Sequence, residues 1–195
     1  MTTTAPRTDA PALRERIVRA AVVLATDEGW ARVTMARLAD EVGVSRQTVY
    51  NEIGSKSGLA EAMILHELDR FLRVVNDAFD AHPDHLVTAL RAAVEAVLEL
   101  SQDNSLLHAV VSATHGADTE LLPLLTTHSE SLLTAAKGVI GDRLEPYRLT
   151  IEPGHLDAAI DMVVRVVLSH VMQPTASPAD TAADIAWIAT RVLGE

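Results

Sequence analysis

Apolar residues recur along most of the 195-residue chain at spacings of three and four, which is the period of an α-helix. Near the start, Leu13, Ile17, Ala21 and Leu24 share one helical face, and Gly29 follows where a helix would end. No segment shows the clean two-residue alternation of a strand. The pattern predicts an all-α protein, with later helices over 34–42, 45–53, 56–81, 84–102, 104–115, 119–145, 153–172 and 178–193.

Two short helices near the start are marked by polar capping residues and glycines. Thr34 is placed to cap the first helix and Gly43 to end it; Ser45 and Gly54 do the same for the second. A three-residue turn containing glycine joins them, which is the layout of a helix-turn-helix unit. In such a unit the first helix supports the second, and the second lies in the major groove of DNA.

The outer face of the second short helix carries the side-chain types that read DNA. Gln and Asn pair with adenine, Arg favours guanine and a Thr methyl contacts thymine. Hydroxyls, Lys and helix N-termini suit phosphate. Taken singly, each of these residues fits a solvated helix face equally well, but the caps and the turn together favour DNA. The candidate DNA-binding residues are Thr34, Ser45, Arg46, Gln47, Thr48, Tyr50, Asn51 and Lys56, with Arg46, Gln47 and Thr48 at base edges.

Charge divides the chain into two parts. The sequence has 16 Lys or Arg and 27 Asp or Glu, a net charge of −11, which taken alone argues against a nucleic-acid partner. Residues 1–60, however, carry 8 basic and 7 acidic side chains, whereas residues 61–195 carry 8 and 20 and all eight His. A nearly neutral first part fits contact with DNA, and the acidic second part is expected to point away from it.

The run from Thr34 to Tyr50 (TMARLADEVGVSRQTVY), followed by Gly54-Ser55-Lys56, resembles the DNA-binding domain of TetR/AcrR-type transcriptional regulators. Residues 50–56 are similar to a subgroup associated with alkane and fatty-acid metabolism. Ile53, where an aromatic residue is more typical, and Asn51-Glu52 depart from the pattern. The resemblance implies phosphate roles for Thr34, Tyr50 and Lys56, a homodimer, a palindromic operator of double-stranded DNA and an effector pocket in the second part. We therefore expect a tail over 1–11, a helix-turn-helix domain over 12–55 and an effector-binding and dimerisation domain over 56–195.

The last two predicted helices carry long apolar stripes that suit either an internal core or a four-helix interface between two subunits. The family resemblance favours the interface. The candidate dimerisation residues are Leu156, Ile160, Val163, Val167, Val171, Ile185, Trp187, Ile188 and Val192.

The middle of the second part is rich in aliphatic side chains, and only 3% of the whole chain is aromatic. Such walls suit a small hydrophobic effector, namely a fatty acid or acyl compound, better than a flat aromatic ligand. The plainer alternative is that these side chains fill the bundle. The candidate ligand-binding residues are Leu98, Leu107, His108, Val111, Ser112, His115, Leu125, His128, Leu132, Val164 and Leu168. Arg165 either holds a ligand carboxylate or, more plainly, pairs across helices with Glu95, Glu99 or Asp161.

Several classes of protein are disfavoured by what the sequence lacks. There is no Cys, no phosphate loop, no dinucleotide fingerprint and no nucleophile elbow, so we expect no enzyme activity, no cofactor and no metal. No apolar run reaches the roughly 18 residues of a membrane span, and no signal peptide is evident, so we expect a cytoplasmic protein without a membrane partner. We expect a ligand-responsive transcriptional regulator, a repressor that its hydrophobic effector releases from the operator. The alternatives are a helical lipid carrier without sequence-specific DNA binding and a lipid-modifying enzyme.

Overall fold

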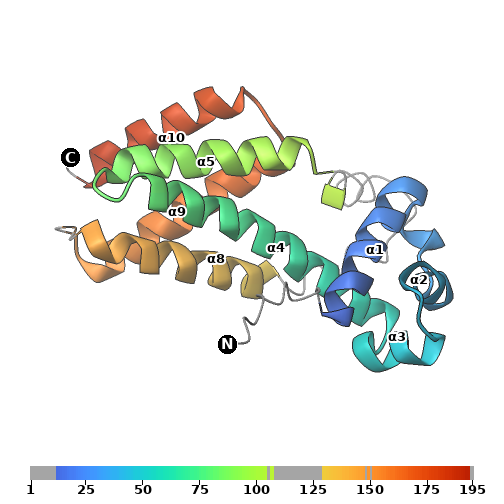
Figure 1. Ribbon diagram of the computed structural model, residues 1–195. Helices are drawn as coiled ribbons and strands as arrows, with labels where there is room; N and C mark the ends of the chain where they lie inside the picture. Colours follow the sequence, from blue (N-terminus) through green and yellow to red (C-terminus); the bar gives the residue numbers. More distant parts are fainter. Residues whose placement is uncertain (1–11, 105, 108–128, 148, 150, 194–195) are drawn as a thin grey trace, which may run out of the picture. The chain divides into compact units, whose positions relative to one another are not determined.

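The computed structural model describes residues 12–104, 106–107, 129–147, 149 and 151–193. Within these ranges every regular element is helical, which confirms the all-α fold (Figure 1). The chain forms two compact units that divide between Ile64 and Leu65, inside a long helix, α4 (Lys56–Ala81). The expected domain boundary, between residues 55 and 56 at the start of that helix, lies nine residues before the division after Ile64. None of the helices in the described ranges is long and apolar enough to cross a membrane.

The first unit contains α1 (Leu13–Glu28), a short 3-10 helix η1 (Trp30–Arg32), α2 (Met35–Val42), α3 (Arg46–Ile53) and the start of α4. Helix α1 packs against both α2 and α3. At the centre of its core, Ile17, Val33, Leu38 and Val49 have no exposed surface. Because Val33 and Leu38 flank the first turn of α2, their burial fixes the angle at which the chain enters that helix.

The expected caps are present at both short helices. The Thr34 hydroxyl oxygen accepts from the backbone N–H of Arg37 (3.3 Å), and the Ser45 hydroxyl oxygen accepts from the N–H of Thr48 (3.0 Å). Helix α2 ends at Gly43, whose φ of +75° favours glycine, and the next N–H, from Val44, returns to the Ala39 carbonyl at 2.9 Å. These local bonds fix the turn between the two helices.

The second unit contains the rest of α4, α5 (Leu86–Gln102), α8 (Ser129–Leu144), a 3-10 turn η2 (Glu145–Tyr147), α9 (Pro153–Met172) and α10 (Pro178–Leu193). Helix α10 packs along α5, and α8 packs along α9 (Figure 1). The helices expected over 104–115 and the first half of 119–145 lie mostly outside the described residues, as does the tail at 1–11.

Two aliphatic clusters hold the second unit together. One joins α4, α5, α8 and α9 through Val75, Phe79, Ala89, Leu144 and Ile160, among others. The other joins α5 to α10 through Val94, Leu98, Ala182 and Ile185, with Val163, Val167 and Val171 of α9 packed against it. Both α9 and α10 are therefore part of the unit's own core.

Candidate nucleic-acid interface

Helix α3 presents a polar face to solvent because its apolar positions are four residues apart. Val49 and Ile53 point into the first unit, with 0% and 7% of their surface exposed. The remaining side chains point outward: Arg46, Gln47, Tyr50, Asn51 and Glu52 are exposed, and Thr48 is half-buried. The face predicted to read bases is thus available to a partner.

The exposed side chains of α3 are paired one turn apart. The Arg46 guanidinium lies over the Tyr50 ring, 5.4 Å from its centre, and donates to the phenol oxygen at 3.3 Å. The Gln47 amide nitrogen donates to the amide oxygen of Asn51 at 3.0 Å. Such pairs restrain long side chains that would otherwise lose conformational entropy on binding. Because an amide carries two donors and an acceptor, Gln47 and Asn51 each keep groups for hydrogen bonds to bases.

Two arginines of α1 hold the far ends of the short helices, a role that the sequence analysis missed. The Arg16 guanidinium donates to the carbonyl of Val42 at the end of α2 (2.8 Å), and Arg14 donates to the carbonyl of Glu52 near the end of α3. These are carbonyls that a helix leaves without a partner, and a cation is favourable at that end. No spacing signal marks such contacts, since they join distant segments through backbone atoms.

Three candidate phosphate-binding residues lie at helix starts, and the fourth, Tyr50, lies within α3. Thr34 and Ser45 cap α2 and α3, and Lys56 begins α4 with its ammonium 4.9 Å from the centre of the buried Trp30 ring. The ring's negative face favours the cation and holds it near the start of α4. A helix N-terminus together with a hydroxyl or an ammonium is suited to a phosphate oxygen.

The candidate effector residues are dispersed where the structure describes them. Leu98 and Val164 are buried in different clusters, Leu107 and Leu132 are half-buried, and Leu168 is 48% exposed. His108, Val111, Ser112, His115, Leu125 and His128 lie outside the described residues. The predicted effector site therefore stays a prediction.

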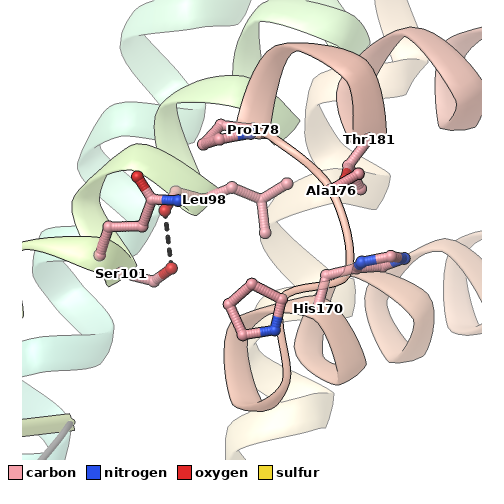
Figure 2. A pocket seen from close by; sticks show the side chains of 8 residues that line it. Leu98, Ser101, His170, Ala176, Pro178 and Thr181 are labelled. Atoms are coloured by element: carbon pink, nitrogen blue, oxygen red, sulfur yellow. Dashed lines mark hydrogen bonds between the residues drawn. The ribbon is translucent and has the colours of Figure 1, made fainter.

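A small hollow is present between the end of α5, the end of α9 and the start of α10 (Figure 2). Its lining includes Leu98, Ser101, His170, Pro174 and Thr181. Its cavity volume is about 10 Å³. That is enough for about one water molecule and far too small for an acyl chain.

The candidate dimerisation residues fall into two groups. Ile160 and Ile185 are buried within the unit, and Leu156, Val163, Val167 and Val171 pack against its clusters. Ile160 and Ile185 have little surface left for a second subunit, whereas the other four keep part of theirs exposed, so an interface role for those four stays a prediction. Trp187, Ile188 and Val192 of α10 are 63%, 51% and 54% exposed. The structure adds exposed apolar residues of α9 that the sequence analysis did not select: Met162, Val166 and Met172.

Arg165 is engaged within its own helix. Its Nε donates to a carboxylate oxygen of Asp161 at 2.6 Å, and Lys137 of α8 reaches the other oxygen at 3.3 Å. The hydrogen bond from Arg165, followed by that from Lys137, lowers the pKa of Asp161. Arg165 therefore forms an ion pair with Asp161, one of the expected partners, but within one helix and not across helices. Among the described residues no cluster of three or more His, Asp or Glu is arranged to hold a metal ion.

A helix-turn-helix unit with an exposed reading face, followed by an acidic helical bundle, defines a DNA-binding regulator. Comparison with known families agrees. Residues 17–63 match the description "Bacterial regulatory proteins, tetR family", and residues 85–191 match "Bacterial Tetracyclin repressor, C-terminal domain". The chain belongs to the TetR family of transcriptional regulators, which are DNA-binding proteins and not enzymes. Members of the family bind operators and small-molecule effectors and act as dimers.

Individual relatives support the finer resemblance. The chain is 28% identical over 178 residues to the HTH-type transcriptional regulator AlkX of Mycobacterium tuberculosis, covering 91% of this chain and 83% of that protein. The crystal structure of the repressor AlkX from Dietzia sp., implicated in biodegradation of n-alkanes, has a TM-score of 0.74 at 27% identity and covers 97% and 98% of the two chains. The nucleoid occlusion factor SlmA of Vibrio cholerae is 32% identical over 100 residues, about half of each chain.

Proposed function

We propose that this regulator is a homodimeric repressor that leaves a palindromic operator when a small aliphatic effector, a fatty acid or acyl compound, binds its second unit. The observation that carries the DNA-binding part is the exposed polar face of α3 over the enclosed core of Val49 and Ile53. The aliphatic composition around the expected pocket and the likeness to AlkX, whose Dietzia form is implicated in n-alkane biodegradation, support the effector class.

In the proposed complex, α3 lies in the major groove with Arg46, Gln47 and Thr48 toward base edges. Thr34, Ser45, Tyr50 and Lys56 bind phosphates, and Asn51 contributes beside Gln47. The acidic second unit stays away from the duplex because its charge repels phosphate.

The exposed apolar side chains of α9 and α10 supply the proposed interface between subunits. Trp187, Ile188, Val192, Met162 and Val166 are all exposed on one chain. A two-fold interface uses the same surface on both subunits, so these residues meet their own copies or each other. A dimer is needed because a palindromic site presents its two halves about 34–36 Å apart, one turn of DNA.

Effector release is a shift between two arrangements of the dimer. One arrangement spaces the two α3 helices to match the half-sites, and the effector binds the other arrangement more tightly. A small displacement suffices, since both recognition helices must stay in register with the same DNA turn.

The test begins with native mass spectrometry of freshly purified protein, followed by release and identification of any bound molecule. A duplex selected from a random-sequence library then serves as operator, with dodecanoate and dodecanoyl thioester as probes at fixed salt. We expect a dimer that carries an acyl-chain mass and loses operator affinity when a probe is added. Equal operator affinity with and without every probe and every released molecule would refute effector release, and a monomer on the operator would refute the dimer.

A further inference from the structure

The side chain of Glu67 is a buried carboxylate in the second unit. It lies on α4, three residues past the division between the units, and only 8% of the residue is exposed. A charged group removed from water is strongly destabilising unless its oxygens are hydrogen-bonded. The hydrogen-bond partners of this carboxylate therefore restrict the positions that this part of α4 can adopt.

Two residues supply those partners. Arg70, one turn along α4, donates to both carboxylate oxygens, at 2.9 and 3.2 Å. Asn104 lies 37 residues further along the chain and is 4% exposed; its amide nitrogen donates to Oε2 at 2.6 Å. Arg70 moves with α4, whereas Asn104 belongs to a different segment. Among the described residues, the bond from Asn104 is thus the one that links Glu67 to another segment of the unit.

Asn104 makes a second hydrogen bond with its other amide atom. Its Oδ1 accepts from the backbone N–H of Leu107 at 2.8 Å, capping the helical turn at residues 106–107. An Asn can do both because it carries a donor and an acceptor. The buried amide of Asn104 therefore joins the turn at 106–107 to α4. A shift of the turn or of α4 strains or breaks the hydrogen bond to the buried Glu67 carboxylate.

We propose that Glu67 and Asn104 are positioning residues that transmit displacement of the turn at 106–107 to α4, and thereby set operator affinity without touching DNA or effector. Helix α4 is continuous from Lys56 in the first unit to Ala81 in the second, so a constraint at Glu67 acts on a helix that both units share. The inference rests on the proposed function, because it names the contact through which effector binding would reach α4.

Variants that exchange the hydrogen-bond donor and acceptor between residues 67 and 104 distinguish the positioning role from a general effect on stability. Asn104→Asp keeps an acceptor for the Leu107 N–H but replaces the donor to Glu67 with a second carboxylate, so the buried pair becomes repulsive. Adding Glu67→Gln restores one hydrogen bond with its direction reversed and keeps the total charge of the native pair. Glu67→Gln alone preserves an oxygen that can accept from Asn104. Asp69→Asn, which removes a charge from an exposed ion pair of the same helix, is the matched control.

Affinity for the library-selected duplex is measured on effector-stripped protein, well below the melting temperature and corrected for the active fraction. Asn104→Asp is expected to bind roughly 2- to 30-fold more weakly, because α4 then populates arrangements that do not fit the operator. The salt dependence and base preference stay unchanged, since no DNA contact is altered. The double variant, Glu67→Gln and Asp69→Asn are expected to bind like the native protein.

An unchanged affinity for Asn104→Asp, or a loss that Glu67→Gln does not restore, overturns the proposal. If Asn104→Asp fails to fold, Asn104→Ser replaces it: the hydroxyl still caps the 106–107 turn but is too short to reach Glu67. In a second experiment dodecanoate is added to both proteins. The loss of operator affinity that it causes is expected to be smaller for the Asn104 variant than for the native protein. If dodecanoate has no effect on the native protein, the proposed effector fails while the effector-free comparison still decides the role of the pair.

Discussion

The two units differ in what they expose. The first encloses its own apolar core and presents polar side chains on α3, already paired one turn apart, as between Gln47 and Asn51. The second encloses two aliphatic clusters and still leaves Trp187 and Ile188 in solvent. Polar groups on a rigid helix fit a polar partner, whereas large apolar groups at the surface of a folded unit indicate a surface that becomes covered. The two units thus expose surfaces of opposite character, one polar and one apolar.

The largest expected effect comes from charging the apolar surface of the second unit. Ile188→Glu places a carboxylate where the proposed dimer is dry, so we expect monomers by sedimentation and operator affinity lower by roughly 100-fold or more, since two linked half-sites bind far more tightly than one. Val23→Glu is the matched control, because Val23 is an equally exposed apolar residue, 57%, but lies in the first unit.

The control variant should remain a dimer. A dimer that survives Ile188→Glu, or dissociates with Val23→Glu, would contradict the assignment of the interface to α10. Deletion of residues 178–195 is a poorer test, because it also removes Ala182 and Ile185 from the cluster shared with α5.

A smaller effect is expected at the polar surface of the first unit. Gln47→Ala should cost about 1–3 kcal/mol of discrimination at one base pair, because a hydrogen-bonding contact to a base edge is lost there and nowhere else. Lys56→Gln should instead weaken binding to all sequences and reduce the slope of log affinity against log salt by about 1. Competition binding with single-substitution duplexes at several salt concentrations distinguishes them. Two identical profiles would mean that Gln47 does not read a base.

The smallest effect is expected at an exposed ion pair of the first unit. The hydrogen bond from Arg37 lowers the pKa of Glu28 below its ordinary value of 4.5. A lowered pKa in the folded state contributes stability above the ordinary value, and that contribution is lost as the pH falls through the folded value. Glu28→Gln should therefore melt slightly lower than the native protein at neutral pH, and the difference should close below pH 4.5. A constant difference across that range would mean that the ion pair is not its source.

The local features of the first unit could be predicted from the sequence because they depend on neighbouring residues. Thr34 and Ser45 cap α2 and α3 through hydrogen bonds to backbone N–H groups three residues further on. Gly43 ends α2 as expected. Contacts between distant segments had no such signal. Arg14 and Arg16 reach backbone carbonyls, and Glu67 meets Asn104 37 residues away; neither contact leaves a periodic pattern.

Periodicity also could not separate the two apolar sides of α9. Val163 and Val167 pack against the cluster shared by α5 and α10, whereas their neighbours Met162 and Val166 are exposed. A helix that is apolar on more than one side has no single inward face to deduce, so the predicted interface contained core residues. The candidate effector residues stay predictions, both inside and outside the described ranges.

The arginines of α1 have a consequence for how such a protein changes the DNA sequence that it recognises. Arg14 and Arg16 hold α3 and α2 by main-chain carbonyls, which every amino acid supplies at those positions. Substitutions on the outer face of α3 therefore leave these attachments in place. Base preference can therefore diverge between descendants of one ancestor while the positions of α2 and α3 against α1 are kept.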